Sequence, residues 1–288
     1  MYAQALVDGV FSGSIYALIA LSLTITYQPT RIMNFAQGEA FVLGGAVGFV
    51  AIGKMHIPWP LALVIMIVAA AIMGYIMERM VMLPVQLSGS RFAWIIATLA
   101  AALIFQAIWT MNFVGDVLSF KPPLDKSYSI AGAVMDFQQI AAIVISLGII
   151  IAYDQFLRRT LLGRAIRATA HNSDTATILG IPTRRIIVGA FMLSTVVVAV
   201  AGFLWVPEIG INPASGLAFT IQGFTAAVIG GVGSPRGALL GGLIVGLLAS
   251  FADAIFGGLS ANIGVFLALG LILVLRPAGL FGKPMEGH

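Results

Sequence analysis

The 288-residue sequence contains no cysteine, only three histidines and few charged residues. Without cysteine there is no disulfide scaffold, no thiolate nucleophile and no cysteine-ligated metal. Lysine, arginine, aspartate and glutamate together make up 9% of the chain, against about a quarter in soluble domains. Because 60% of the residues are hydrophobic, an ordinary soluble enzyme is excluded. The composition is that of a polytopic membrane protein built from helices.

Intramembrane enzymes need chemical groups that this sequence does not place inside an apolar segment. His56, His171 and His288 all lie near or in expected loops, so no histidine is available to activate a serine nucleophile. There is no HExxH zinc motif, and the Gly-Lys pairs at 53–54 and 282–283 lack the following serine or threonine of a phosphate-binding loop. We therefore expect no enzymatic activity and no bound cofactor or metal. The expected role is to move a molecule across the bilayer or to anchor a partner.

Nine segments are charge-poor and close to the length of about 20 residues that crosses a bilayer. They are Gly9–Tyr27, Asn34–Gly53, Pro60–Met77, Phe92–Val114, Phe137–Tyr153, Ile186–Pro207, Ile209–Pro235, Gly237–Ala252 and Ala254–Leu275. The seventh segment contains Pro213 and several glycines, which favours a loop or a broken helix. We therefore expect one membrane domain over residues 1–288, with eight or nine crossings, some of them discontinuous.

The positive charges are distributed unevenly between the two sets of loops. Short cytoplasmic loops carry an excess of lysine and arginine. Of the 15 such residues, three fall on one side, Lys54, Lys121 and Lys126, and the others fall on the opposite side. This asymmetry predicts a cytoplasmic C-terminus, an external N-terminus if all segments cross, and one large external loop at 115–136. Since nothing basic precedes Arg31, we expect the first segment to be a retained helix and not a cleaved signal.

A polar stretch stands at the head of the second apolar segment. It contains Asn34, Phe35, Gln37, Gly38 and Glu39. An ionisable side chain inside a membrane segment costs about 2.5 to 3.5 kcal/mol, so we expect Glu39 to face the bundle interior or a water-filled path. The alternative, which is compatible, is an interfacial cap with Asn34 as the N-cap and Glu39 near the positive helix end. A half-helix that begins here would direct its N–H groups toward an anionic substrate group.

Glycine is abundant, and several glycines are spaced for helix packing. Four pairs are each four residues apart, namely Gly9 and Gly13, Gly44 and Gly48, Gly237 and Gly241, and Gly242 and Gly246. This spacing predicts close approach of neighbouring helices. A different run precedes Pro235 and contains Gly230, Gly231, Gly233 and Ser234. It cannot form the interior of a rigid helix, so we expect a hinge, a re-entrant tip or a cytoplasmic turn.

A 28-residue insertion, Arg158–Arg185, carries six arginines between two apolar segments. Good helix formers from Leu161 to Leu179 predict one helix, because Gly180 and Pro182 supply the stop signals. The polar positions within it are Arg164, Arg167, His171, Asn172 and Asp174. Apolar positions lie between them, so one face is suited to docking on another protein. The alternative is a solvated loop held by lipid phosphates.

Several motifs along the chain resemble those of LivH-type permeases, the membrane subunits of branched-chain amino acid ABC importers. The matching blocks are Tyr16–Leu21, Arg31–Glu39, Glu78–Arg79, Gly163–Thr169, Leu179–Ile181, Ala226–Ser234 and Arg276–Gly282. Two positions depart from the family pattern. Gln37 stands where many members have histidine, and Pro84 lies where the family more often has an arginine–proline pair. Both departures leave the substrate open.

The resemblance implies an all-α permease of the type II ABC importer fold in a bacterial inner membrane. Its expected partners are a second, LivM-like permease, two ATP-binding-cassette ATPases that use the ATP, and a periplasmic or extracellular substrate-binding protein; no nucleic acid is expected. Under this resemblance the insertion 158–185 becomes the coupling helix, and the ATPase-coupling residues are Arg164, Arg167, Asn172, Asp174 and Gly180. The expected path residues are Asn34, Phe35, Gln37, Gly38 and Glu39. The expected gate is Gly230, Gly231, Gly233 and Ser234.

Three alternatives remain open at this point. Within the same family, urea, short amides and aromatic carboxylates are possible substrates beside the favoured branched-chain amino acids. An ion-coupled secondary carrier using Glu39, Glu208 or Asp253 is less favoured, because the chain has the arginine-rich insertion and lacks two clear inverted halves. A membrane anchor without cargo is the least favoured.

Overall fold

The structure is a computed structural model and describes residues 2–88, 92–115, 117–122, 126–130, 132–257 and 280. Its α-helices are α1 (Tyr2–Thr30), α2 (Gln37–Gly48), α3 (Trp59–Ile76), α4 (Leu83–Ser88), α5 (Ala93–Asn112), α6 (Phe137–Arg159), α7 (Leu161–His171), α8 (Ser173–Ile178), α9 (Thr183–Ile209), α10 (Gly216–Gly230) and α11 (Pro235–Phe256). Short π-helical segments η1 (Phe49–Lys54) and η2 (Met77–Met82) continue α2 and α3, and a 3₁₀ turn η3 (Pro213–Ser215) leads into α10.

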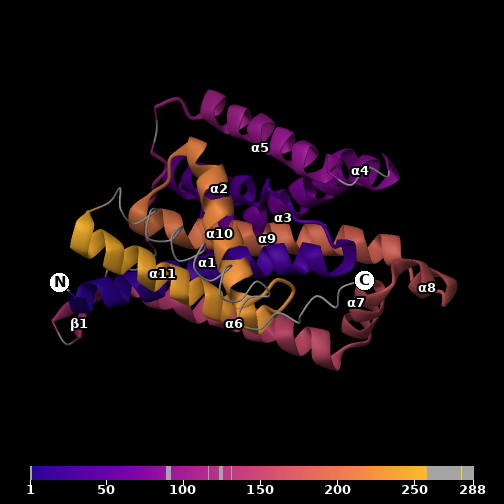
Figure 1. Ribbon diagram of the computed structural model, residues 1–288. Coiled ribbons are helices and arrows are strands. Elements are labelled where there is room, and N and C mark those ends of the chain that lie inside the picture. Colours follow the sequence, from indigo (N-terminus) through magenta and orange to yellow (C-terminus); the bar gives the residue numbers. More distant parts are fainter. Residues whose placement is uncertain are drawn as a thin grey trace.

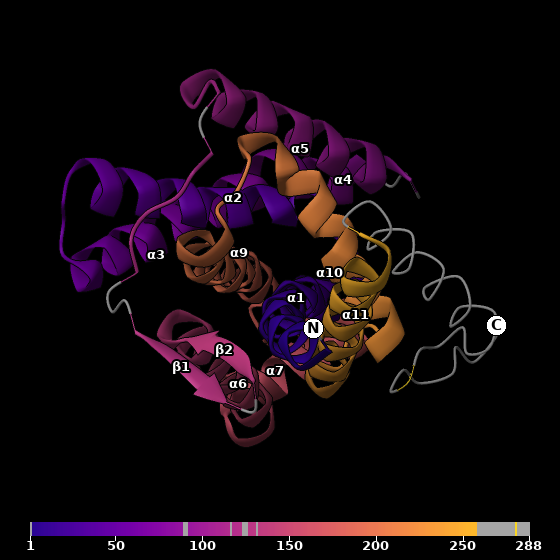
Figure 2. The same cartoon turned by 90° about the vertical axis from the view of Figure 1, so that its left-hand side faces the viewer.

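Helix α1 is the centre of the bundle. Viewed end-on it is surrounded by α6, α9, α10 and α11, which all contact it (Figure 2). Because α1 is apolar on every side, it is suited to this buried position. Several of its hydroxyl groups bond within the helix, since Ser14 Oγ and Ser22 Oγ each donate to a carbonyl three residues earlier at 2.7 Å.

Six stretches of the described chain are long and apolar enough to cross a membrane, the first Tyr2–Thr30 and the last Pro235–Phe256. The predicted second and seventh segments form the shorter helices α2, with η1, and α10. The all-α polytopic membrane fold is therefore confirmed, although six long spans and two shorter helices do not reproduce the predicted count directly. Nearly all of the ninth segment, Ala254–Leu275, lies outside the described residues, as do the C-terminus and all of the Arg276–Gly282 motif except Leu280.

The boundary placed between the eighth and ninth segments is wrong. Helix α11 begins at Pro235, with Ser234 at its N-cap, and it continues through Asp253 to Phe256. Asp253 is exposed near the end of the helix, where a carboxylate does not interrupt the backbone hydrogen bonds. The helix ends at Gly257, whose φ of 87° is the left-handed conformation that glycine adopts readily.

The stretch predicted as a loop at 115–136 contains a small hairpin that the sequence pattern did not indicate. Strand β1 (Ser127–Ile130) pairs antiparallel with β2 (Ala133–Asp136). Asp136 then forms a capping box with Gln139 at the start of α6. Gln4 of α1 bonds the backbone of Val134 through both its side-chain oxygen and nitrogen, at 3.0 and 3.1 Å. The hairpin therefore lies at the end of the bundle where α1 begins (Figure 1).

The opposite end of the bundle carries α7 and α8 (Figure 1). Several arginines lie in or beside these helices. Arg31, just after α1, donates from Nη2 to the carbonyl of Ala170 in α7 at 2.9 Å. Arg236, at the start of α11, lies 3.3 Å from the carboxylate of Asp154 near the end of α6. The two sets of loops that differ in charge in the sequence therefore lie at opposite ends of the structure. We call these the arginine-rich end and the hairpin end.

The glycine pairs pack helix against helix, as their spacing predicts. A Cβ on Gly13 of α1 would lie 2.9 Å from the Cα of Leu243 in α11, and one on Gly9 would lie 3.0 Å from Leu247. From the other side, Gly242 and Gly246 of α11 face the α1 backbone. Because glycine has no side chain, the two helices approach to backbone contact here.

Candidate functional site

The polar stretch at 34–39 lies where two short helices cross. The backbone N–H of Gly38, in the first turn of α2, donates to Thr220 Oγ1 of α10 at 2.8 Å. A Cβ on Gly38 would overlap the carbonyl oxygen of Gly216, the first residue of α10. The backbones of α2 and α10 are therefore in direct contact, and α10 runs obliquely to the long helices in Figure 1.

Glu39 is buried at this crossing. Its side chain is 0% exposed, and its carboxylate packs against Gly216. In the described part of the structure neither carboxylate oxygen has a hydrogen-bond partner. The carboxylate lies at the positive ends of two helix dipoles, in the first turn of α2 and beside the first residue of α10. A carboxylate that is buried without a partner is costly, so its presence points to a function beyond packing.

The interpretation of Asn34 as the N-cap of the second segment is wrong. Helix α2 begins at Gln37, with Ala36 at the N-cap position and no side-chain capping bond. Asn34 Oδ1 instead accepts from the N–H of Ala36 at 3.0 Å, and its Nδ2 donates to Gln37 Oε1 at 3.2 Å. A bond from a backbone N–H to a nearby side-chain oxygen, the kind that an N-cap makes, thus closes a turn before the helix. Glu39 does lie in the first helical turn.

Aromatic rings line the crossing, and Phe35 is the one among them that the sequence predicts as a path residue. Phe35 stacks on Trp94 of α5 with ring centres 6.0 Å apart and meets Phe224 of α10 at 5.8 Å. Phe41 of α2 stacks on Phe219 of α10 at 4.2 Å. Aromatic residues are common in apolar segments, so only the fold distinguishes these. The one sequence signal near them is the break before α10.

The run at 230–234 is a tight turn between α10 and α11. Gly231 and Gly233 have φ values of 98° and 88°, and Ser234 Oγ accepts from the N–H of Gly237 at 3.1 Å to cap α11. The turn is held to α1, because Gln28 Nε2 donates to the Gly233 carbonyl at 2.9 Å. Since Arg236 follows, the turn lies at the arginine-rich end of the bundle.

The insertion forms two helices, and the prediction of one helix from Leu161 to Leu179 is wrong. Asn172 has an extended backbone and ends α7. Its Oδ1 then accepts from the N–H of Thr175 at 2.9 Å and so caps α8. Gly180, with a φ of 83°, follows the end of the second helix. The stop signal is where the sequence predicts it, but a cap in the middle divides the segment.

All the predicted coupling residues are exposed at this end. They are Arg164, Arg167, Asn172, Asp174 and Gly180. Gly163 and Thr169 face the bundle, whereas four large apolar side chains point outward. These are Leu161, Leu162, Ile178 and Leu179, and the last two are 85% and 74% exposed. Exposed apolar residues among charged ones are typical of a protein docking surface.

These features define a polytopic α-helical membrane protein with a buried carboxyl group at a helix crossing. The chain belongs to the family described as "Branched-chain amino acid transport system / permease component", whose model matches residues 5–276. It is 32% identical over 297 residues to the high-affinity branched-chain amino acid transport system permease protein BraD of Pseudomonas aeruginosa, covering 98% of this chain and 96% of that protein. It is also 32% identical to LivH of Escherichia coli, with the same coverage. The resemblance to LivH-type permeases is confirmed, and the chain is a transport permease subunit.

A solved structure supports the fold independently. PsaBC from Streptococcus pneumoniae in complex with Fab superposes with a TM-score of 0.54, covering 97% of this chain and 93% of that chain. The two sequences are 13% identical, so this likeness concerns the fold alone. Within the described residues, no group of three or more histidine, aspartate or glutamate side chains is arranged to hold a metal ion.

Proposed function

We propose that this chain is the membrane subunit through which a branched-chain amino acid enters the cytoplasm. The observation that carries the proposal is the relationship to BraD and LivH, which extends over 98% of this chain and 96% of each relative. The energy would come from ATP hydrolysed by two separate ATPase chains, since this sequence has no phosphate-binding loop. A second permease and an external substrate-binding protein would complete the importer.

The proposed translocation path follows Asn34, Phe35, Gln37, Gly38 and Glu39. A branched-chain amino acid has a charged ammonium group and an apolar side chain. The buried carboxylate of Glu39 suits the ammonium group, and the rings around Phe35 suit the apolar side chain. Few polar groups among aromatic side chains are typical of small-molecule sites. The arrangement therefore supports a path that recognises the general shape of the solute.

Passage through this path requires the helices at the crossing to separate. Gly38 and Gly216 are in contact, so no solute fits between α2 and α10 in this conformation. We place the gate at Gly230, Gly231, Gly233 and Ser234, because this turn joins α10 to α11. The positive φ values at two of its glycines allow backbone changes that other residues resist.

The proposed coupling surface is formed by α7 and α8, with Arg164, Arg167, Asn172, Asp174 and Gly180 in contact with the ATPases. Support comes from the exposure of all five residues beside outward-facing leucines and isoleucine. A displacement of α7 would reach α1 through the bond from Arg31 to Ala170. Movement of the ATPases would thus be transmitted to the centre of the bundle.

The proposed location is the bacterial inner membrane, with the arginine-rich end in the cytoplasm. The six apolar spans and the excess of arginine at the end with α7 and α8 support this orientation. It places the hairpin of β1 and β2 outside, where the binding protein would dock, and it predicts a cytoplasmic C-terminus.

Reconstitution tests the proposal. The tagged chain is purified from its native membrane, its co-purifying chains are identified, and the assembly is placed in proteoliposomes with enclosed ATP. We expect two ATPases and a second permease, and uptake of labelled leucine that unlabelled isoleucine and valine inhibit. Preferential uptake of urea, a short amide or benzoate would move the substrate to the family alternatives. Gradient-driven uptake by the chain alone, without ATPases, would refute the importer mechanism.

A further inference from the structure

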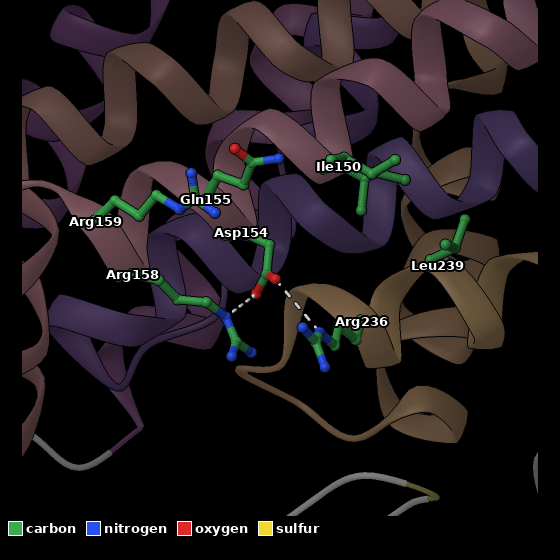
Figure 3. A pocket seen from close by; sticks show the side chains of 8 residues that line it. Ile150, Asp154, Gln155, Arg158, Arg159, Arg236 and Leu239 are labelled. Carbon is green, nitrogen blue, oxygen red and sulfur yellow. Dashed lines mark hydrogen bonds and ion pairs between the residues drawn. The ribbon is translucent and has the colours of Figure 1, made fainter.

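A pocket of about 420 Å³ lies at the arginine-rich end of the bundle. Figure 3 shows the side chains that line it. It is formed where the last turns of α6 meet the first turns of α11. Asp154, Arg158 and Arg159 come from α6, and Arg236 comes from α11. Neither the proposed path nor the proposed coupling surface uses these side chains.

The pocket has more positive than negative charge. Asp154 is the single acidic residue of its lining and is shared between two arginines. Arg158 Nε lies 3.0 Å from one of its oxygens and Arg236 Nε lies 3.3 Å from the other. Three arginines and one aspartate leave a formal charge of +2, since 3 − 1 = 2. Figure 3 shows the two paired arginines approaching Asp154 from separate helices.

The arginines are available to a ligand. The side chains of Arg158 and Arg236 are 54% and 64% exposed, whereas that of Asp154 is 17% exposed. Ion pairs this exposed contribute little to stability and exchange readily for another anion. A phosphate offers stronger binding, because its oxygens accept paired hydrogen bonds from guanidinium groups. The charge therefore favours an added anion at this position.

The remaining lining is apolar and belongs to membrane-spanning helices. Ile151 of α6 and Leu239 of α11 line the pocket on the side toward the middle of the bundle. Both helices are apolar spans, and only a minority of the residues in each span is buried inside the bundle. A basic pocket between membrane helices with an apolar wall below it matches a phosphate group attached to acyl chains.

We propose that this pocket binds an anionic phospholipid, with its phosphate between Arg158, Arg159 and Arg236. The acyl chains lie along Ile151 and Leu239. The phosphate competes with Asp154 for the guanidinium groups, so a bound lipid connects the end of α6 to the start of α11. This site is independent of which solute the permease carries.

Lipid binding to the purified full-length chain, with any partners that co-purify, tests this proposal. The delipidated protein is titrated with phosphatidylglycerol, with phosphatidylcholine of the same acyl chains, and with inorganic phosphate, and bound lipid is counted by native mass spectrometry. We expect phosphatidylglycerol to bind more tightly than either of the other two. Arg158→Gln and Arg236→Gln should each weaken its binding about fivefold. Arg185→Gln, an exposed arginine at the same end outside the pocket, should have no effect.

The variant Asp154→Asn should change phosphatidylglycerol binding in the opposite direction. Removing the carboxylate frees two arginines and adds one net positive charge, so phosphatidylglycerol should bind about fivefold more tightly. A site that exists only to hold the helices together through ion pairs would show no such gain. Equal binding of phosphatidylcholine and phosphatidylglycerol, unchanged binding in all four variants, or inorganic phosphate binding as tightly as the lipid would each overturn the proposal.

Discussion

The carboxylate of Glu39 lies directly against Gly216, at the point where α10 begins. Only a residue without a side chain leaves room for it there. In the described structure the carboxylate has no hydrogen-bond partner, so its favourable interactions are with the positive ends of its own helix α2 and of α10. Such an interaction weakens smoothly as the helices separate. The contact between Glu39 and Gly216 therefore fixes where α2 and α10 meet and still allows the two helices to separate.

Neutralising Glu39 separates a role in transport from a role in packing. Glu39→Gln keeps the shape and replaces a buried carboxyl group that has no hydrogen-bond partner, so we expect thermal stability to be unchanged or higher. Uptake by the reconstituted importer should fall about tenfold, the effect of about 1.4 kcal/mol at the limiting step. The matched control is Glu208→Gln, since Glu208 is bonded to Gln139 at 2.8 Å near the hairpin end. Normal uptake by Glu39→Gln would show that Glu39 has a structural role and no role in transport.

Adding one methyl group at the crossing should destabilise the fold. A Cβ at position 216 overlaps the carboxylate of Glu39, so Gly216→Ala should cost about 1 to 3 kcal/mol through overpacking. Gly189→Ala in α9 is the control, because nothing lies within 4 Å of its added Cβ. That variant should be stabilised by about 0.5 to 1 kcal/mol, as glycine weakens a helix interior. Melting temperatures in one detergent compare the two, and equal melting temperatures would contradict the described packing.

The turn between α10 and α11 can be tested by comparing two glycines with similar backbones. Gly233 and Gly115 have φ values of 88° and 75°, so alanine at either should cost about 1 to 2 kcal/mol of backbone strain. A Cβ at position 233 would lie 3.8 Å from the ring of Tyr27, an ordinary contact. If the turn is the gate, Gly233→Ala should reduce uptake well below that of Gly115→Ala. Parallel losses of stability and uptake in both would show that the turn only joins two helices.

Charge removal on α7 and α8 should disconnect ATP hydrolysis from transport. Alanine at Arg164, Arg167 and Asp174 leaves the buried face of the insertion intact, so membrane insertion should be normal. Binding-protein-stimulated ATP hydrolysis and leucine uptake are measured in the same vesicles, and their ratio should change at least about tenfold, or about 1.4 kcal/mol of coupling. Lys126→Ala, near the hairpin end, is the control. An unchanged ratio in the triple variant would place the ATPase contact elsewhere.

The sequence predicts the long helices well, because their signal is local. A charge-free run of sufficient length must satisfy its own backbone in lipid and so forms a helix. Pro213 and the glycines around it likewise indicate the break before α10. The division of the insertion at Asn172 also had a local signal, since an asparagine followed by Ser173 and Asp174 is typical of a helix start.

Other features depend on contacts that no local pattern contains. Gly216 becomes the neighbour of Glu39 only when α10 folds back across α2, far along the chain. Asn34 has the residue type of an N-cap, but the backbone direction before Gln37 decides whether it caps a helix or closes a turn. The pocket around Asp154 likewise requires α6 and α11 to be adjacent, which their sequences do not specify.

The central position of α1 has a consequence for biosynthesis. This helix is synthesised before all the helices that surround it, α6 and then α9 to α11. Its covering is therefore complete only after α11 has been inserted. The internal bonds of Ser14, Ser22 and Thr26 suit this interval, because their hydroxyls need no neighbour. Helix α1 is therefore stable in the bilayer before the later helices pack against it, in the order in which they are synthesised.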